Sequence, residues 1–238
     1  MISPILKDIR TALRAHADES DAVVLRRFFK TGPGEYGEGD RFLGARVPAT
    51  RQVAREYKNL ALADAQALLH SPIHEERHLA LIILKQKYLK STPDQKTQIY
   101  RIYLENTRYI NNWDLVDTSA EHIVGAYLHN RSCKPLYKLA QSESLWERRI
   151  AIMSTFHFIK NNEFHETLRI AEMLITDLED LIHKAVGWML REVGKRDSNV
   201  EELFLRKHYQ YMPRTMLRYA IEKFPESLRQ QYLKGTIK

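Results

Sequence analysis

Small residues recur at the centres of apolar helical segments, and this repeat constrains the fold more than any other feature. The five segments are residues 74–89, 113–128, 145–160, 180–195 and 212–224. Their central alanines, separated by roughly 30 to 40 residues, are Ala80, Ala120, Ala151, Ala185 and Ala220. A more amphipathic helix fits between each pair of segments, and no segment alternates apolar and polar residues as a strand does. The sequence therefore predicts an all-α fold of stacked helix pairs, a curved solenoid with an extended concave groove.

The charge balance favours an anionic partner for that groove. The chain of 238 residues has 37 Lys and Arg against 30 Asp and Glu, a net charge of +7. A long basic groove suits a long polyanion. We expect a single domain over residues 1–238, interrupted by one glycine-rich loop between helices at about 31–46.

The sequence lacks the marks of a membrane or exported protein. No apolar run approaches the ~18 residues that a membrane span needs, and the N-terminal residues alternate charged and apolar side chains, unlike a signal peptide. We therefore expect a cytoplasmic protein with no membrane partner. The single cysteine, Cys133, excludes an internal disulfide and a cysteine-rich zinc site, and we expect it to be inert.

Residues 32–37, GPGEYG, match the G-x-G-x-x-G pattern of loops that bind nucleotide phosphates. Such a loop follows a strand and opens a helix whose N-terminal N–H groups face the phosphate. Here the preceding segment, residues 21–30, has the pattern of an amphipathic helix, and Glu35, Glu38 and Asp40 would stand where phosphate should bind. We therefore predict a flexible, acidic loop between two helices.

Residues 74–78, HEERH, match the H-E-x-x-H motif in which two histidines bind zinc and the glutamate activates water. Ser71 and Pro72 mark a helix start with Ser71 as N-cap, so the acidic residues of the motif fall in the first turns, where they complement the helix dipole. The extended motif needs a histidine at 84, which is Leu84. We therefore interpret the motif as helix capping and predict no metal site.

Cations and aromatic rings share faces of the later helices. One predicted stripe, whose members step by 4, 3 and 4 residues, consists of Lys184, Trp188, Arg191 and Lys195. A second shared face consists of Arg149, Phe156 and Lys160. The last helices could extend the track with Arg214, Arg218 and Arg229. A ring among cations suits contact with the sugars or bases of nucleic acid.

Trp113 and Asp117 lie one helical turn apart, which places an indole beside a carboxylate. Taken alone, this pair is also typical of a core tryptophan beside a capping aspartate. Three segments taken together favour a functional role for the pair: NWDLVD at 112–117, LWERR at 145–149 and KAVGWMLRE at 184–192. In content, order and separation these segments resemble the AlkD-type DNA alkylation-repair glycosylases, and the resemblance spans nearly the whole chain.

The resemblance implies a curved stack of HEAT-like repeats that binds double-stranded DNA on its concave face. It further implies hydrolysis of the N-glycosidic bond of purines alkylated at N3 or N7, by a monomer that needs no metal or other cofactor. By motif, Asp117 matches the catalytic carboxylate, Trp113 and Trp188 match two indoles that face the deoxyribose, and Arg149 matches an arginine at the DNA backbone. The further DNA contacts we expect are Lys160, Lys184, Arg191, Lys195, Arg46, Phe28 and Tyr36.

One position departs from the family's pattern. Phe28 stands where the family prototype has a tyrosine near the end of its second helix, and the segment that follows, through Arg46, is longer. Tyr36 could supply the missing ring or hydroxyl. Two alternatives to a glycosylase therefore stay open: a non-catalytic solenoid that binds DNA of particular structure, and a scaffold that binds proteins.

Overall fold

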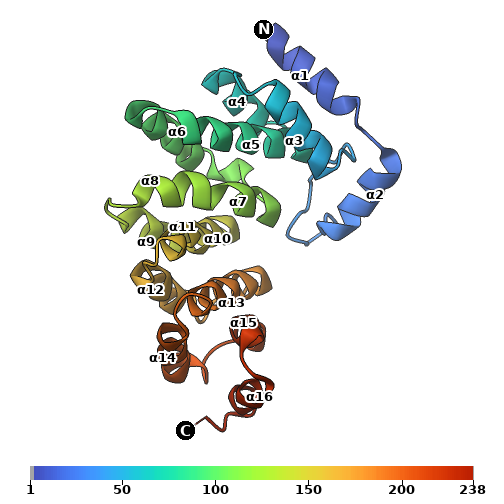
Figure 1. Cartoon of the computed structure of the whole chain (residues 1–238). Coiled ribbons are helices and arrows are strands. Elements are labelled where there is room, and N and C mark those ends of the chain that lie inside the picture. Colours follow the sequence, from blue (N-terminus) through green and yellow to red (C-terminus); the bar gives the residue numbers. More distant parts are fainter. Residues whose placement is uncertain (1–2, 238) are drawn as a thin grey trace. The chain divides into compact units, whose positions relative to one another are not determined.

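The computed structural model describes residues 3–237, whose regular secondary structure is helical (Figure 1). These residues contain no β-strand, and one isolated bridge pairs Arg41 with Ile73. The chain forms two compact units, unit 1 ending at Ile123 and unit 2 beginning at Val124. Among the helices described, none is long and apolar enough to span a membrane.

Unit 1 is organised around its longest helix, α5. The helices of this unit are α1 Pro4–Arg14, α2 Glu19–Phe28, α3 Val47–Glu56, α4 Leu62–Leu69, α5 His74–Lys90, α6 Pro93–Glu105 and α7 Trp113–Ala120, with a 3-10 turn at Thr107–Tyr109. α5 packs against α3, α4, α6 and α7 (Figure 1). Because neighbours cover it on several sides, even the charged residues of its first turns are buried.

Unit 2 repeats the pattern of an amphipathic helix followed by a core helix. Its helices are α8 Ala126–Leu128, α9 Lys134–Ala140, α10 Leu145–Ser154, α11 Phe156–Lys160, α12 His165–Met173, α13 Asp180–Gly194, α14 Ser198–His208, α15 Arg214–Ala220 and α16 Glu226–Lys234, with a 3-10 turn at Ile221–Lys223. α10 packs on α9, and α13 packs on α10, α12, α14 and α15. A π-helical turn, Glu121–Gly125, joins the two units.

The all-α, helix-pair fold predicted from the sequence is confirmed. All five central alanines have 0% exposure, as expected of small residues where core helices meet. The pairs α4/α5, α9/α10 and α12/α13 each join an amphipathic helix to a core helix, and the two members are in contact. Two core segments are less regular than predicted: 113–128 contains the π-helical turn, and 145–160 is divided at Thr155.

Local sequence sets several helix starts. Asp18 caps α2 by accepting a hydrogen bond from the backbone N–H of Asp21. α6 begins with a capping box in which Thr92 and Gln95 each bond the other's backbone, and Pro93 occupies the first turn. Asp197 caps α14 in the same way as Asp18 caps α2. These caps satisfy N–H groups that have no partner within their own helix.

Gly187 allows α13 and α15 to approach closely. A Cβ at this position would lie 2.4 Å from the carbonyl oxygen of Met216 and 2.5 Å from the Cβ of Tyr219. Both neighbours belong to rigid parts of α15, so neither can move away without shifting the helix. The glycine is therefore a packing requirement of unit 2.

Replacing Gly187 by alanine should destabilise the protein by about 1–3 kcal/mol, because the extra methyl overpacks the contact between α13 and α15. Urea unfolding followed by circular dichroism measures this loss. Gly32→Ala is the matched control, since its nearest neighbour is the end of the flexible Glu35 side chain. Equal free energies of unfolding for the two variants would contradict the packing role of Gly187.

Candidate functional site

A cavity of about 440 Å³ opens in unit 1 between α2, the loop that follows it, α5 and α7. We call it the aromatic cavity. Its aromatic lining consists of Phe28, Phe29, Phe42 and Trp113, and its carboxylates include Asp114 and Asp117. The volume lies in the range of small-ligand sites, and the lining combines apolar rings with a few polar groups.

The aromatic rings of the cavity support one another. The edge of Phe28 meets Trp113 with ring centroids 5.7 Å apart, and Trp113 stacks on Phe29 at 5.3 Å. Phe29 stacks in turn on Phe42 at 5.2 Å. Phe29 and Phe42 are buried, whereas the side chain of Phe28 is 60% exposed at the rim. The inner rings therefore fix the indole, and Phe28 is free to contact a ligand.

Helix α7 presents Trp113 and Asp117 to this cavity from adjacent turns. The Asn112 side chain accepts a hydrogen bond from the backbone N–H of Trp113 and thereby fixes the start of the helix. Both side chains are half-buried. The structure thus brings together Trp113, Asp117 and Phe28, three residues that the sequence selected.

His74 is the centre of a buried polar network behind the rings. Its Nδ1 lies 3.0 Å from a carboxylate oxygen of Asp40, and its Nε2 lies 2.8 Å from a carboxylate oxygen of Asp114. Arg77 donates a 2.6 Å hydrogen bond to the other oxygen of Asp40. One histidine on α5 therefore joins the glycine-rich loop to the first turn of α7.

The network holds His74 in its charged form. Burial opposes the charge, but the carboxylate of Asp114 and the hydrogen bonds to Asp114 and Asp40 outweigh it and raise the pKa of His74 to about 9. Although burial raises the pKa of both aspartates, their contacts with His74 hold the pKa of Asp40 and of Asp114 below its ordinary value. The imidazolium also lies against two aromatic rings: its ring centroid is 4.9 Å from that of Phe29 and 4.6 Å from that of Phe42.

The remaining residues of the HEERH motif also serve structural contacts. Glu75 accepts hydrogen bonds from the backbone N–H groups of Leu43 and Gly44, and Glu76 pairs with Arg10 at 2.9 Å. Burial lowers the pKa of His78 to about 4, and its Nε2 lies 3.2 Å from the hydroxyl of Thr118.

No group of three or more His, Cys, Asp or Glu within residues 3–237 is placed to hold a metal ion. The helix begins two residues later than predicted. Ile73, not Ser71, is the N-cap, and Ser71 accepts a hydrogen bond from the N–H of Ile73.

The glycine-rich loop, residues 29–46, does not form a phosphate site. Glu35 accepts a hydrogen bond from the N–H of Gly32, and Glu38 accepts one from the N–H of Gly34. Carboxylates of the loop therefore occupy the donors that a phosphate would need. In the second half of the loop, Asp40 and Phe42 are buried and both contact His74 of α5, and the flexibility of the loop stays a prediction. The hydroxyl of Tyr36 donates to the backbone carbonyl of Phe28 at 3.3 Å, and its ring does not line the aromatic cavity.

Unit 2 contains a second cluster of aromatic rings and cations. Phe156 lies 6.1 Å from Trp188, and the ammonium of Lys160 lies over its ring at 4.4 Å. The guanidinium of Arg196, which the sequence reasoning did not select, lies 6.0 Å from the same ring. Trp188 is half-buried and donates to Glu192 at 3.2 Å. Of the three residues predicted to share one helix face, Phe156 and Lys160 lie one turn apart on the short helix α11, whereas Arg149 lies on α10.

The predicted cationic stripe of α13 is paired with acids. Lys184 lies 2.7 Å from Asp180, and Lys195 lies 2.6 Å from Glu192. Arg191 pairs with Glu222. Spacing could have shown two of these partners, because Asp180 and Glu192 lie within one helical turn of Lys184 and Lys195, but it could not show Glu222. Further along, Arg214 donates to the carbonyl of Leu233, and Arg229 pairs with Glu226.

Two other predicted DNA contacts have protein partners. Arg149 is only 5% exposed, and its guanidinium donates a 2.5 Å hydrogen bond to the carbonyl oxygen of Leu181. It thereby links α10 to α13. Arg46, at the rim of the aromatic cavity, pairs with Asp21 through two hydrogen bonds but remains largely exposed. Their contacts with DNA stay predictions.

Residues 9–224 match the family model described as DNA alkylation repair enzyme. The match covers most of the chain, so the protein belongs to this family, and DNA is the partner that the family indicates. Among solved structures, the chain resembles one described as a predicted DNA alkylation repair enzyme from Enterococcus faecalis. The two share 16% sequence identity and a TM-score of 0.68 over 89% of this chain and 98% of that chain, which shows a common helical-repeat fold. Comparison with curated proteins finds no match.

The charge of His74 should make stability depend on pH. Because folding raises the pKa of His74 from 6.5 to about 9, its contribution is complete below pH 6.5 and is lost as pH rises through 9. The difference in unfolding free energy between wild type and His74→Gln should therefore shrink by up to about 3 kcal/mol between pH 6.5 and 10. Urea unfolding across this range measures it.

His78→Gln is the matched control. Its histidine is neutral in the fold throughout this range, because burial lowers its pKa to about 4. The variant should keep the alkaline loss of stability that wild type shows. A wild type and a His74→Gln variant whose stabilities fall in parallel would contradict a charged His74.

Proposed function

We propose that the protein is a monofunctional DNA glycosylase that hydrolyses the N-glycosidic bond of purines alkylated at N3 or N7 in duplex DNA. Membership of the DNA alkylation repair enzyme family supports the role in repair. The observation that carries the finer proposal is the placement of Asp117 and Trp113 side by side on α7, both lining the aromatic cavity. We further propose that the protein acts as a cytoplasmic monomer without metal or other cofactor.

The chemistry requires little more than one carboxylate. An alkylated purine already carries a positive charge, so the electron pair of the breaking bond leaves with a neutral base and no acid need protonate it. The sugar meanwhile gains oxocarbenium character, which the charge of Asp117 stabilises. Asp117 also orients the attacking water, whose oxygen bonds to C1′ of the sugar. The carboxylate of Asp117 then accepts the proton that this water loses.

The aromatic side chains complete this reading. The face of an indole attracts nearby positive charge, which suits both the cationic base and the developing charge on the sugar. In the proposal Trp113 contacts the sugar in this way, and the motif of Trp188 assigns it the same kind of contact. Phe28, exposed at the rim beside Trp113, adds an apolar contact.

Asp114, the neighbouring carboxylate of the cavity, is assigned a positioning role. Asp114 accepts a hydrogen bond from the charged His74 and another from the N–H of Leu115, so its charge is already compensated within the protein. A carboxylate held in this way stabilises the fold more than it can stabilise a new charge in a ligand. Asp114 therefore positions α7, and Asp117 acts on the substrate.

Asp117→Asn should lower the single-turnover release of 7-methylguanine from methylated duplex DNA by roughly 10²–10³-fold, the scale on which removal of one stabilising group slows an enzyme. Liquid chromatography of the released base measures the rate. Binding to undamaged duplex should change little, because the amide keeps the shape of the side chain. Asp64→Asn on α4, away from the aromatic cavity, is the matched control and should react as wild type does. A wild-type chain that releases no alkylated base would contradict the proposal.

A non-catalytic DNA-binding protein is the second candidate, and one observation favours it. The tyrosine hydroxyl at the family's second-helix position is absent at Phe28, and the hydroxyl of Tyr36 bonds the backbone of Phe28 instead of facing the cavity. The cavity therefore lacks one polar group that the family prototype has. This candidate requires tight DNA binding without base release.

Salt titration with and without Asp117 separates the two candidates. A binding protein should show salt-sensitive affinity for branched or bent duplex that is the same for wild type and Asp117→Asn, with no base released. If the protein is a glycosylase, both wild type and Asp117→Asn should bind lesion DNA, and only wild type should release base. Fluorescence anisotropy on the duplexes used in the release assay provides both readouts.

A further inference from the structure

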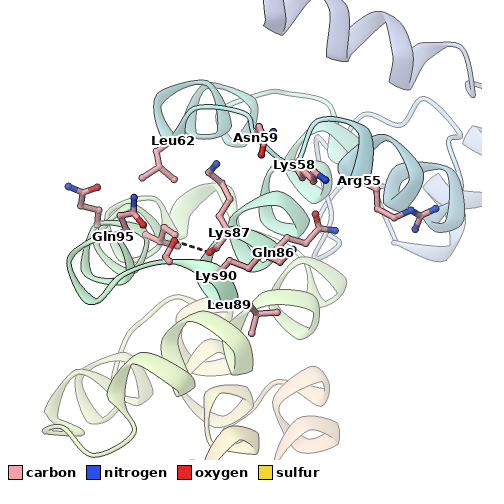
Figure 2. Close-up of a pocket in the computed structure, with 12 residues that line it drawn as sticks. Arg55, Lys58, Asn59, Leu62, Gln86, Lys87, Leu89, Lys90 and Gln95 are labelled. Atoms are coloured by element: carbon pink, nitrogen blue, oxygen red, sulfur yellow. Dashed lines mark hydrogen bonds between the residues drawn. The ribbon is translucent and has the colours of Figure 1, made fainter.

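Unit 1 contains a second and larger cavity, of about 740 Å³, at the other end of α5 from His74. We call it the basic cleft. Figure 2 shows its walls, which come from the C-terminal ends of α3 and α5 and from the starts of α4 and α6. Its cations are Arg55, Lys58, Lys87 and Lys90. No carboxylate is among the residues that line it, and amide side chains such as Gln86 and Gln95 complete its polar surface.

The four cations of the basic cleft are not neutralised by the protein. Within residues 3–237, none of them forms an ion pair with Asp or Glu. The contrast with α13 is direct, because Lys184, Arg191 and Lys195 each have an acidic partner. Like charges held in one cleft repel each other, so an anionic ligand that enters it gains from all of them.

The basic cleft continues a line of cations that starts at the aromatic cavity. On α3, Arg51 lines the aromatic cavity and Arg55 lines the cleft, and Lys58 lines the cleft from the turn that follows the helix. Arg51 and Arg55 are one turn apart, so they share one face of the helix. On α5, Lys85 lines the aromatic cavity, and Lys87 and Lys90 line the cleft. The line therefore follows two helices that pack against each other.

We propose that the basic cleft binds the phosphates of the DNA arm that extends from the lesion. The inference rests on the DNA binding of the proposed function, but it does not need base release. Arg51 and Arg55 are separated by roughly 6 Å along α3, at a rise of about 1.5 Å per residue. Phosphates of one strand advance about 3.4 Å each along the duplex, so this separation matches about two phosphate steps, and Lys58 extends the row beyond the helix. Cations placed in a row suit a strand better than a single small anion.

The test uses the full chain with Lys58→Gln, Lys87→Gln and Lys90→Gln combined. These residues are exposed or half-buried, so the variant should fold as wild type does. Its dissociation constant for a long duplex should rise roughly 10- to 100-fold, and the slope of log K against log salt should fall by up to about 3, because each lost phosphate contact removes close to one counterion. The single-turnover rate of base release at saturating protein should not change.

The matched control removes three cations elsewhere in unit 1: Lys7→Gln, Arg14→Gln and Arg101→Gln. These side chains are exposed and line neither cavity, and the change in net charge is the same. The control should bind the long duplex nearly as wild type does. Equal weakening in both triple variants would show a general charge effect and overturn the proposal.

Duplex length identifies the ligand. Wild type should lose affinity for DNA when the arm on one side of the lesion is shortened. The affinity of the cleft variant should not change with that same shortening. A cleft variant whose affinity still depends on the length of both arms would overturn the assignment. The assignment would also be overturned if millimolar inorganic phosphate or an acidic peptide blocked wild-type binding to the same extent whatever the arm length. If neither chain releases base while the arm effect persists, the glycosylase proposal fails and the basic cleft stands.

Discussion

The charged His74 between two buried aspartates is the interaction on which the aromatic cavity depends. It places one positive charge between Asp40 of the loop and Asp114 of α7, and so joins two segments that are far apart in the sequence. Breaking one side would leave a buried charge without compensation, which costs far more than a surface pair. The ring of His74 also supports Phe29 and Phe42, on which Trp113 rests. The position of the indole, and of Asp117 one turn later, therefore follows from this network.

Charge pairing distinguishes two kinds of basic surface in the protein. In unit 2, acids such as Glu192 compensate the cations near Trp188, so DNA would have to compete with internal ion pairs. In unit 1, the cations of the basic cleft have no such partners among residues 3–237. Net charge counts both kinds alike, but only unpaired cations gain fully from an incoming phosphate. Affinity for DNA should therefore depend more on unit 1 than the stripes in the sequence suggest.

The sequence predicts the helices well and the polar contacts poorly. Apolar spacing and the central alanines locate every core helix because burial of one face depends only on local order. The sequence likewise predicts that Trp113 and Asp117 lie side by side, because both are on one short helix. The role of His74 could not be predicted from the sequence, because its partners Asp40 and Asp114 are 34 and 40 residues away along the chain. Nor could spacing alone show that Arg149 is buried, since helix contacts decide that.

Base release from duplex DNA tests the central claim most directly. Purified wild-type protein is mixed in excess with duplexes that carry either 7-methylguanine or unmodified guanine at the same position, and the free base is measured over time. The account predicts release of 7-methylguanine and none of guanine, because only the alkylated base leaves as a neutral molecule without an acid. Stable binding to both duplexes with no release of either base would contradict it.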